Sequence, residues 1–537
     1  MGEGLALGRA SSAASGRIAG AYSIYVLLVL MLVNVFILMD RQVLTILAED
    51  IKADLRISDA DMGFIFGTSL SVFYAVFSIP LGRTADVWSR KNLMAICVAS
   101  WSAMIILTGS ARNFASFATF RAGVGVGEAG ASPAAMSLIS DYFPPKMRST
   151  ALAIFSCGVP LGQGLGLFMG GVILDAWYRA FPTASSAPLG LAGWQAAIIS
   201  IALPGPFLAF WLFSLKEPKR GQSEGIEMLA HPHPLRECWN ELQAALPIFS
   251  LVLLRKMGVP ARATWQNICI GLAIVLAVAL LILATGDTAQ WIALGFGFYC
   301  IACWAQILAH RDPATFGMIF RCRTVMFTNI GLAAYIFVSF GVAAWIVPYL
   351  MRAHHVSASE AGLVMGLITS GFGFFGALLG GVAADLLQRY TARARAYVLL
   401  GSLALTVPSV ILMLLADNKS EAYVYVALFY LTSTAWYGIG PSIINGLVLP
   451  RMRGTASAFF LVTITLLGMA LGPYFMGHLS DLFLSGGSNP SDALRQGILG
   501  GLPVLAFAAI MLVLVIRNLP RDEVSRLARA RALGEAV

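Results

Sequence analysis

Charged residues are scarce in this chain. Only 12% of its 537 residues are Asp, Glu, Lys or Arg, whereas 58% are hydrophobic. A water-soluble fold could not keep so much apolar surface away from solvent. The composition therefore excludes a soluble protein and indicates a chain that lies in a lipid bilayer.

Cysteine is also scarce, and its arrangement excludes a disulfide framework. The seven cysteines form an odd, scattered set, and several lie inside apolar stretches. Cys300 and Cys303 have the spacing of a metal-binding pair, but no second pair accompanies them, and a structural zinc ion needs four ligands. We interpret both as structural residues, and we expect no metal and no cofactor.

Several patterns that carry known chemistry are missing. The chain lacks the strand alternation of an outer-membrane barrel. It has no Gly-rich phosphate loop for ATP-driven pumping, and no Ser-His-Asp set or metal-ligand helix that would indicate an enzyme. The formal net charge is +9, but the basic residues lie in short loops at intervals, so no nucleic-acid partner is expected.

Apolar stretches long enough to span a bilayer recur along almost the whole chain. Each has roughly 20 residues, and together they predict an all-α membrane protein with about fourteen transmembrane helices. The stretches cover residues 22–45, 60–82, 92–111, 113–140, 149–174, 194–214, 265–284, 290–309, 325–350, 361–384, 396–416, 422–449, 454–479 and 497–516. The first contains Asp40 and Arg41 and lacks a small-residue cleavage site after it, so we interpret it as a retained helix.

The basic residues also predict the orientation. Most Lys and Arg fall in the loops that are cytoplasmic if the N-terminus lies inside, as the positive-inside rule requires. We therefore expect both termini in the cytoplasm.

Two short patterns occur twice, about 300 residues apart, which indicates two parallel halves. Gly82, Asp86 and Arg90 reappear as Gly381, Asp385 and Arg389 at the same spacing. The string Pro-Lys-Met-Arg-Ser-Thr-Ala from residue 145 reappears as Pro-Arg-Met-Arg-Gly-Thr-Ala from residue 450.

Two six-helix halves leave two apolar stretches between them, which we interpret as an inserted hairpin. The expected segments are a cytoplasmic leader (1–21), the first half (22–214), a cytoplasmic linker (215–263), the inserted hairpin (264–310), a cytoplasmic loop (311–324), the second half (325–517) and a basic cytoplasmic tail (518–537). Within the linker, Leu235–Lys256 has apolar residues at helical spacing and a basic end. It could lie on the membrane surface or pack under the bundle.

Four ionisable residues lie inside spanning stretches, where charge is costly, and each is a candidate for function. They are Asp40 and Arg41 in the first stretch and Arg121 and Glu128 in the fourth. Arg121 and Glu128 are nearly two helical turns apart, so they share one helix face at a separation of about 10 Å. Either Asp40 and Glu128 titrate during transport, or they form static ion pairs that only satisfy buried polarity.

Candidate substrate contacts and gate residues complete the set. Arg41 and Arg121 could meet a substrate together with Asn34, Trp345 and Tyr437, although the aromatic residues could also lie in the core or face lipid. The candidate gate residues are Gly82, Asp86, Arg90, Lys91, Gly381, Asp385 and Arg389. We expect the two Asp residues to hold the cytoplasmic ends of the halves together, while the Arg and Lys residues could instead be plain anchors.

With these residues in view, the chain resembles the major facilitator superfamily and, within it, the spinster-like branch. Residues 82–91 are similar to the superfamily's signature loop, although Val87 stands where an Arg usually follows the Asp. The branch resemblance rests on Asp40-Arg41-Gln42, on the run from Arg121 to Gly130, on residues 137–144, and on Trp345, Arg352, His354, Gly472-Pro473 and Ser480-Asp481.

The resemblance implies a secondary transporter that works by alternating access and couples to protons through Asp40 and Glu128. Eukaryotic relatives move lysophospholipids and sphingoid phosphates, which favours a small amphiphilic or anionic solute, lysolipid-like before others. An organic-anion symporter and a drug efflux pump remain alternatives, and a membrane sensor that no longer transports is an alternative of another class. We expect a monomer in a bacterial inner membrane, with the solute, protons and lipid as its partners.

Overall fold

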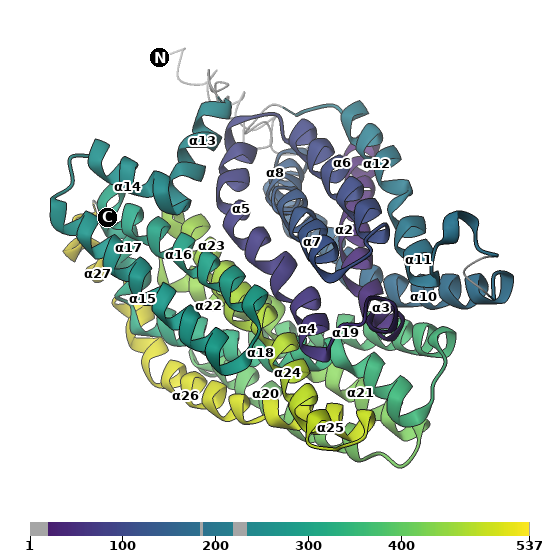
Figure 1. Ribbon diagram of the computed structural model, residues 1–537. Coiled ribbons are helices and arrows are strands. Elements are labelled where there is room, and N and C mark those ends of the chain that lie inside the picture. Colours follow the sequence, from purple (N-terminus) through teal and green to yellow (C-terminus); the bar gives the residue numbers. More distant parts are fainter. Residues whose placement is uncertain (1–19, 183–185, 219–233, 536–537) are drawn as a thin grey trace.

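The computed structural model describes residues 20–182, 186–218 and 234–535, which form helices and no strand (Figure 1). The expected leader therefore lies almost wholly outside the described residues, as does part of the expected linker. The helices of the first half are α2 (Ala21–Ile46), α3 (Ala48–Leu55), α4 (Asp59–Phe66), α5 (Thr68–Val87), α6 (Arg90–Gly109), α7 (Phe114–Glu128), α8 (Ala131–Tyr142), α9 (Pro145–Ser156), α10 (Gly158–Ala180), α11 (Gly193–Ala202) and α12 (Pro204–Ser214), with a 3₁₀ turn at Pro188–Gly190.

The remaining helices divide into a middle group and the second half. The middle group consists of α13 (Pro234–Ala245), α14 (Pro247–Lys256), α15 (Ala261–Thr285), α16 (Thr288–Arg311) and α17 (Pro313–Phe320). The second half consists of α18 (Arg323–His354), α19 (Ala358–Gln388), α20 (Ala394–Leu415), α21 (Lys419–Ser433), α22 (Trp436–Leu447), a 3₁₀ turn (Pro450–Met452), α23 (Arg453–Thr463), the π-helical segment η4 (Ile464–Met469), α24 (Leu471–Ser485), α25 (Pro490–Gly501), α26 (Pro503–Val524) and α27 (Arg526–Ala532).

Twelve helical stretches among the described residues are long and apolar enough to cross a membrane, and five of them join two or more of the helices given above. They coincide with twelve of the fourteen stretches expected from the sequence. The other two, residues 113–140 and 422–449, are each divided into a pair of shorter helices, α7 with α8 and α21 with α22. Pro133 accounts for the first division, because it cannot donate a hydrogen bond to the carbonyl of Ala129 four residues earlier.

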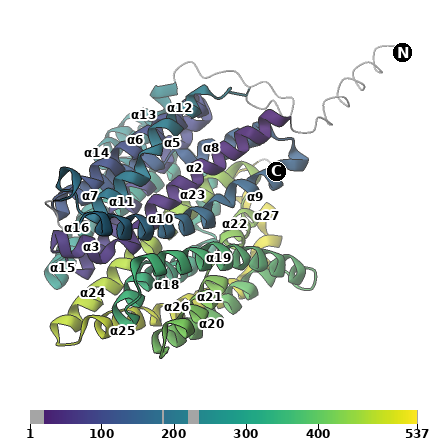
Figure 2. The same ribbon diagram turned by 90° about the vertical axis from the view of Figure 1, so that its right-hand side faces the viewer.

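The two halves pack against each other mainly at one end of the bundle. We call the end where α2 begins and α26 finishes the terminal end, and the end where α3 meets α4 the far end (Figure 2). Toward the far end α10 packs on α19, and α4 packs on α24. An added Cβ at Gly171 would lie only 2.4 Å from the carbonyl oxygen of Ala358. Glycine therefore allows the two backbones to touch there.

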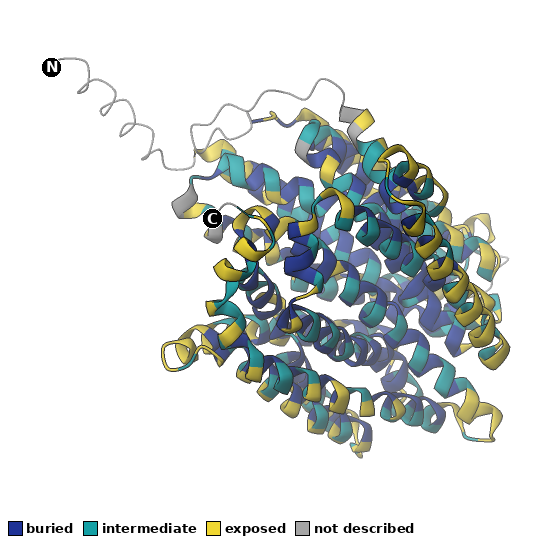
Figure 3. Ribbon diagram, turned by 90° about the vertical axis from the view of Figure 1, so that its left-hand side faces the viewer, coloured by how far each residue is buried: buried dark blue, intermediate teal, exposed yellow. Residues whose placement is uncertain are grey.

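The inserted helices lie beside one seam between the halves. One face of α16 packs on α5 and η4, where Leu294 and Gly297 contact the region of Val72 and Leu466. The partner helix α15 is largely exposed. Its side chains Leu272, Val275 and Leu283 are 64%, 64% and 83% exposed. Exposed residues, yellow in Figure 3, cover the outside of the bundle, and buried residues, dark blue, lie between the helices. The seam between α5 and η4 is thus covered by α16.

The helix expected over Leu235–Lys256 is two helices, because Leu246 is extended before Pro247. Ala244 of α13 and Leu254 of α14 bury themselves with Ile307 of α16, and α13 also packs on α5. The pair therefore contacts the bundle.

Candidate functional site

The four ionisable residues inside the first half come together between α2 and α7. Asp40 and Arg41 are consecutive on α2, so their side chains leave the helix about 100° apart. Arg121 and Glu128 lie on α7, and Glu128 is the last residue before the division of that helix. Two neighbouring residues on one helix can therefore reach two residues that are two turns apart on the other.

The pairs are crossed. Arg41 donates from Nε and Nη2 to one oxygen of Glu128, at 2.9 and 2.5 Å, while Arg121 Nη1 donates to Asp40 Oδ2 at 2.7 Å. The second oxygen of each carboxylate, Glu128 Oε1 and Asp40 Oδ1, is buried without a hydrogen-bond partner among the residues that the structure describes. Each acid is thus held by one arginine, and each keeps one oxygen free.

The two pairs differ in their exposure. The side chains of Arg121 and Asp40 are each 2% exposed, and that of Glu128 is 0% exposed, but the Arg41 side chain is 27% exposed. The Arg41 guanidinium lies over the ring of Tyr74, 5.0 Å from its centre. Arg41 is therefore the one partly exposed member of the four.

Both halves contain a helix that is divided, and in the first half the charged site lies at this division. In the first half the division follows Glu128, and in the second half it lies at Thr434 and Ala435, just before Trp436 and Tyr437. Interrupted helices at corresponding positions of two repeats are a common mark of a substrate site in transporters. Trp436 and Tyr437 stack on each other, with ring centres 4.3 Å apart.

Two of the candidate substrate contacts have partners inside the protein. Asn34 is 6% exposed and donates to the carbonyl of Phe155 within the first half. Trp345 is fully buried near the far end, where its Nε1 donates to the carbonyl of Pro473 and its ring meets Phe66 edge-on. Of the expected aromatic contacts, Tyr437 stacks on Trp436, while Trp345 is part of the contact between the halves.

A second charged cluster closes the far end, and the sequence did not single it out as a gate. Arg352 on α18 donates to Glu49 Oε1 at 2.8 Å and to Asp59 Oδ1 at 2.7 Å, both on the first half. Lys52 pairs with Asp59 as well. Asp481 on α24 accepts hydrogen bonds from the N–H groups of Asp59 and Ala60, the first residues of α4, at 3.0 and 2.7 Å. Ionic contacts therefore join the two halves here.

The expected gate residues at the terminal end make contacts within or next to one half. Arg90, 1% exposed, donates to Glu217 at 2.9 Å and pairs with Asp141, while Lys91 Nζ donates to the carbonyl of Phe213. Asp141 and Phe213 belong to the first half, and Glu217 lies in the linker just after it, so none of these partners is on the second half. Asp141 and Glu217 could have been found from the sequence, because each lies near a helix end next to a basic loop.

The other gate residues that the structure describes do not join the two halves at the terminal end. Asp385 on α19 and Arg389, just after its end, are exposed. An added Cβ at Gly381 would meet no heavy atom of the described residues within 4 Å, and one at Gly82 would meet only Pro133 of its own half. The side chain of Asp86 lies outside the described residues. The gate expected between the halves is thus not formed by the described gate residues, and its role stays a prediction.

The comparison with protein families agrees with this architecture. The model of the Major Facilitator Superfamily matches residues 30–473. The chain belongs to the major facilitator superfamily. It is therefore a multi-pass membrane transporter and not an enzyme. Among the described residues, no group of three or more His, Cys, Asp and Glu side chains is placed to hold a metal ion.

Known relatives place the chain in the spinster-like branch of this superfamily. It is 26% identical to an MFS-type efflux pump of Mycolicibacterium smegmatis, over 90% of this chain and 89% of that protein. It is 24% identical to the sphingosine-1-phosphate transporter SPNS2 of Danio rerio, over 83% of this chain and 74% of that protein. The crystal structure of a bacterial homologue of the human lysosomal transporter spinster, inward-facing and unoccupied, superposes with a TM-score of 0.68 at 25% identity, covering 94% of this chain and 99% of that one.

Proposed function

We propose that this transporter moves an anionic amphiphile together with a proton, and that the ion pair between Arg41 and Glu128 couples the two. The observation that carries the proposal is the difference in exposure within that pair. The Arg41 side chain is 27% exposed, whereas Glu128 is completely buried. An incoming anion can therefore meet the cation without meeting the acid.

The Arg41–Glu128 pair determines whether binding of the anion favours or opposes binding of the proton. An anionic headgroup that binds Arg41 competes with Glu128 for the guanidinium. A carboxylate left in the interior without its cation is more stable with a proton. Binding of the anion therefore favours binding of a proton at Glu128, and by linkage a proton at Glu128 favours the anion. Asp40 and Arg121 form a second, fully buried pair that can take a proton in the same way.

We propose a substrate with a single apolar chain, because α16 covers one of the two seams between the halves. Because α16 fills the space beside α5 and η4, lateral access from lipid is left to the other seam, between α10 and α19. There Ser370 donates to the carbonyl of Pro160 at 2.9 Å, and toward the terminal end an added Cβ at Gly371 or Gly381 would meet none of the described atoms within 4 Å. Exposed Phe375 and Leu379 on α19 offer an apolar surface along this path.

The terminal end is the cytoplasmic end in this proposal, as the positive-inside rule requires. The contacts between the halves at the far end then close the periplasmic side. The described arrangement corresponds to an inward-facing state, and the gate at Asp86 and Asp385 would form when the transporter faces outward.

Calorimetric titration of the purified protein tests the coupling. The probe is a single-chain lipid phosphate, and the control is an uncharged glycerol ester of the same chain. Titration in buffers of different ionisation enthalpy counts the protons taken up on binding. We expect uptake of protons with the phosphate and none with the ester. Glu128→Gln should bind the phosphate with reduced proton uptake, and Arg41→Gln should lose the preference for the phosphate.

Two results would overturn the proposal. One is binding of the lipid phosphate to the wild-type protein without proton uptake, and the other is an unchanged preference in Arg41→Gln. A drug efflux pump is the second candidate, because the relative from Mycolicibacterium smegmatis is an efflux pump. A cationic drug should gain affinity when Arg41 is replaced, whereas the lipid phosphate should lose affinity.

A further inference from the structure

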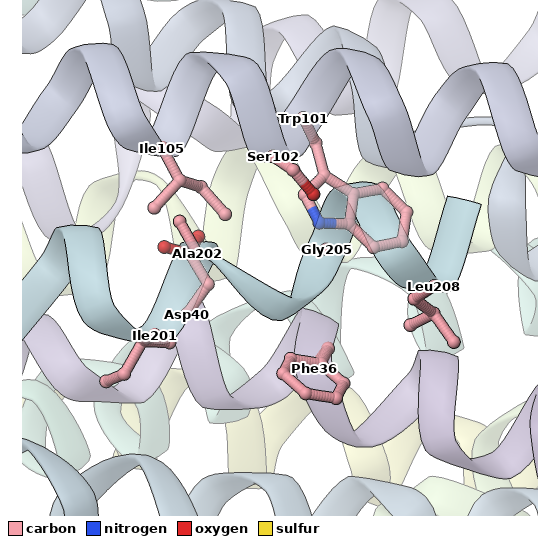
Figure 4. Close-up of a pocket in the computed structure, with 9 residues that line it drawn as sticks. All are labelled: Phe36, Asp40, Trp101, Ser102, Ile105, Ile201, Ala202, Gly205 and Leu208. Atoms are coloured by element: carbon pink, nitrogen blue, oxygen red, sulfur yellow. The ribbon is translucent and has the colours of Figure 1, made fainter. Parts of the chain in front are cut away.

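A small cavity lies behind the charged pairs, inside the first half. It is enclosed by α2, α6, α11 and α12 and is lined by Phe36, Asp40, Ser102, Ile105, Ala202 and Gly205, among others (Figure 4). The volume open to the centre of a water molecule is about 10 Å³, which is close to the smallest volume that holds one water. The cavity is therefore large enough for one water molecule and too small for any other ligand of the transporter.

Two polar atoms on this cavity lack partners. Asp40 and Ser102 are each 1% exposed. Arg121 occupies Asp40 Oδ2, but neither Asp40 Oδ1 nor Ser102 Oγ has a hydrogen-bond partner in the part of the chain that the structure describes. A buried polar atom in this condition destabilises a protein unless something satisfies it.

The position of the Ser102 hydroxyl is not the usual one for a serine in a helix. Such a hydroxyl can bond to the carbonyl four residues earlier, and Thr108 on the same helix does so, donating to Met104 at 2.8 Å. Ser102 does not. Gly205 makes room for it, because an added Cβ at that residue would lie 1.9 Å from Ser102 Oγ.

We propose that the cavity binds one water molecule, which bridges Asp40 Oδ1 and Ser102 Oγ and allows Asp40 to change its protonation state without rearrangement. This proposal rests on the proton coupling proposed above. Arg121 can only donate hydrogen bonds, so it favours the ionised acid. A water molecule can donate to the carboxylate and can accept from the carboxylic acid, and a serine hydroxyl can reverse its own bond in the same way. Ser102 is then a positioning residue for the water.

The charged groups around Asp40 are all on the opposite side. Arg121 and Glu128 face it from α7, and Arg41 adjoins it on α2, whereas the residues of α6, α11 and α12 that line the cavity are uncharged. Removal of the water should therefore change the titration of Asp40 without altering the ion pairs directly.

Infrared difference spectroscopy of the full-length protein tests the proposal. Two variants remove the water by different means: Ser102→Ala deletes a partner, and Ala202→Val fills the cavity. Thr108→Val is the matched control, because it deletes a buried hydroxyl of the same helix that is bonded to its own backbone. The probes are the O–H stretch of a bound water, identified by its shift in H₂¹⁸O, and the carboxyl band that disappears in Asp40→Asn.

We expect a bound-water band in the wild-type protein and in Thr108→Val, and its loss in Ser102→Ala and Ala202→Val. Both variants remove a hydrogen bond to Asp40 Oδ1, so the carboxyl band of Asp40 should change in both and keep its wild-type position in Thr108→Val.

A wild-type spectrum without this band, or an unchanged band in Ala202→Val, would overturn the water site. If the band behaves as expected but the Asp40 carboxyl does not titrate, the water site stands and the proton coupling at Asp40 fails. The two proposals can therefore fail separately.

Discussion

The two halves share a fold, but their buried polar groups are of different kinds. The interior of the first half holds four ionisable side chains, paired as Arg41 with Glu128 and Arg121 with Asp40. The corresponding region of the second half holds hydroxyl groups instead.

In the second half the hydroxyls form one network around Tyr335. Its hydroxyl lies 2.9 Å from Ser402 Oγ and 3.1 Å from Thr406 Oγ1, and it donates to the carbonyl of Thr432 at 3.2 Å. These groups join α18, α20 and α21, and none of them changes charge near neutral pH. The comparison indicates that the first half carries the proton chemistry, while this network of the second half holds its helices in place.

The largest effect should come from neutralising both acids of the first half. The double variant Asp40→Asn, Glu128→Gln fixes the neutral form of each carboxyl, so it can neither release nor take up the coupled proton. We expect uptake driven by a pH gradient in proteoliposomes to fall to nearly the level of protein-free vesicles, while substrate binding largely survives. Gradient-driven uptake at a near wild-type rate would show that the proton chemistry lies elsewhere.

The next largest effect should be on stability. Arg121→Met leaves Asp40 buried without its cation, and removing one partner of a buried pair costs about 3–5 kcal/mol. The double variant Arg121→Met, Asp40→Leu removes both charges, so it should recover most of the thermal stability in detergent but not the pH dependence of transport. Equal melting temperatures for the single and double variants would contradict this view of the pair.

The second half does supply a charge at the far end, where Arg352 binds Glu49 and Asp59. Arg352→Gln should weaken the contact between the halves there and increase the outward-facing population several-fold. The buried residue Thr68, whose hydroxyl donates to the carbonyl of Ala470 across the seam, is a suitable reporter position. Labelling of Thr68→Cys by a membrane-impermeant thiol reagent should rise in the Arg352→Gln background. No change would remove this cluster from the gating mechanism.

Loss of the central hydroxyl of the network should lower stability without changing the pH dependence of transport. Tyr335→Phe leaves its partners in place but deletes the central hydroxyl, so we expect a loss of about 1 kcal/mol or slightly more. The pH profile of transport should match that of the wild-type protein. A shifted profile would mean that the second half takes part in the proton chemistry, and the contrast between the halves would fail.

The contrast between the halves was partly visible in the sequence. Charge is rare in apolar stretches, so Asp40, Arg41, Arg121 and Glu128 could be selected by position alone, and the spacing of the last two predicted a shared helix face. The crossed pairing could not be predicted, because it depends on how α2 and α7 pack. The hydroxyl network was hidden, since Ser and Thr are ordinary residues in membrane helices.

The far-end cluster was missed for another reason. Arg352, Asp59 and Asp481 lie far apart in the sequence, and each occurs at a helix end, where a charge is expected on a membrane surface anyway. We predicted the gate at the terminal end instead, because the repeated pattern lies there. There the structure shows Arg90 bound to Asp141 of its own half and to Glu217 just after α12, because both carboxylates lie beside it.

The smallest contrast concerns two ion pairs at the terminal end, one formed by Arg90 and one by Arg395. In the first half Arg90 and Glu217 are 2.9 Å apart, and Arg90 is 1% exposed. In the second half Arg395 and Glu523 are 3.7 Å apart, and both are partly exposed. We expect Glu217→Gln to cost about 1 kcal/mol and Glu523→Gln only a few tenths, as measured by thermal unfolding at neutral pH.

The cost of Glu217→Gln should depend on pH. Burial raises the pKa of Glu217, but the hydrogen bonds from the N–H of Lys91 and from the Arg90 guanidinium outweigh burial and hold that pKa below its ordinary value. A carboxyl with a lowered pKa in the folded protein contributes stability above the pKa of the unfolded chain, about 4.3. It loses that contribution as the pH falls through the lowered value. The stability difference between wild type and Glu217→Gln should therefore be constant near neutral pH and shrink below about pH 4.3, because only the wild-type protein loses an ionised partner for Arg90. A difference that stays constant down to pH 3 would show that Arg90 is held by Asp141 and the neighbouring carbonyls alone.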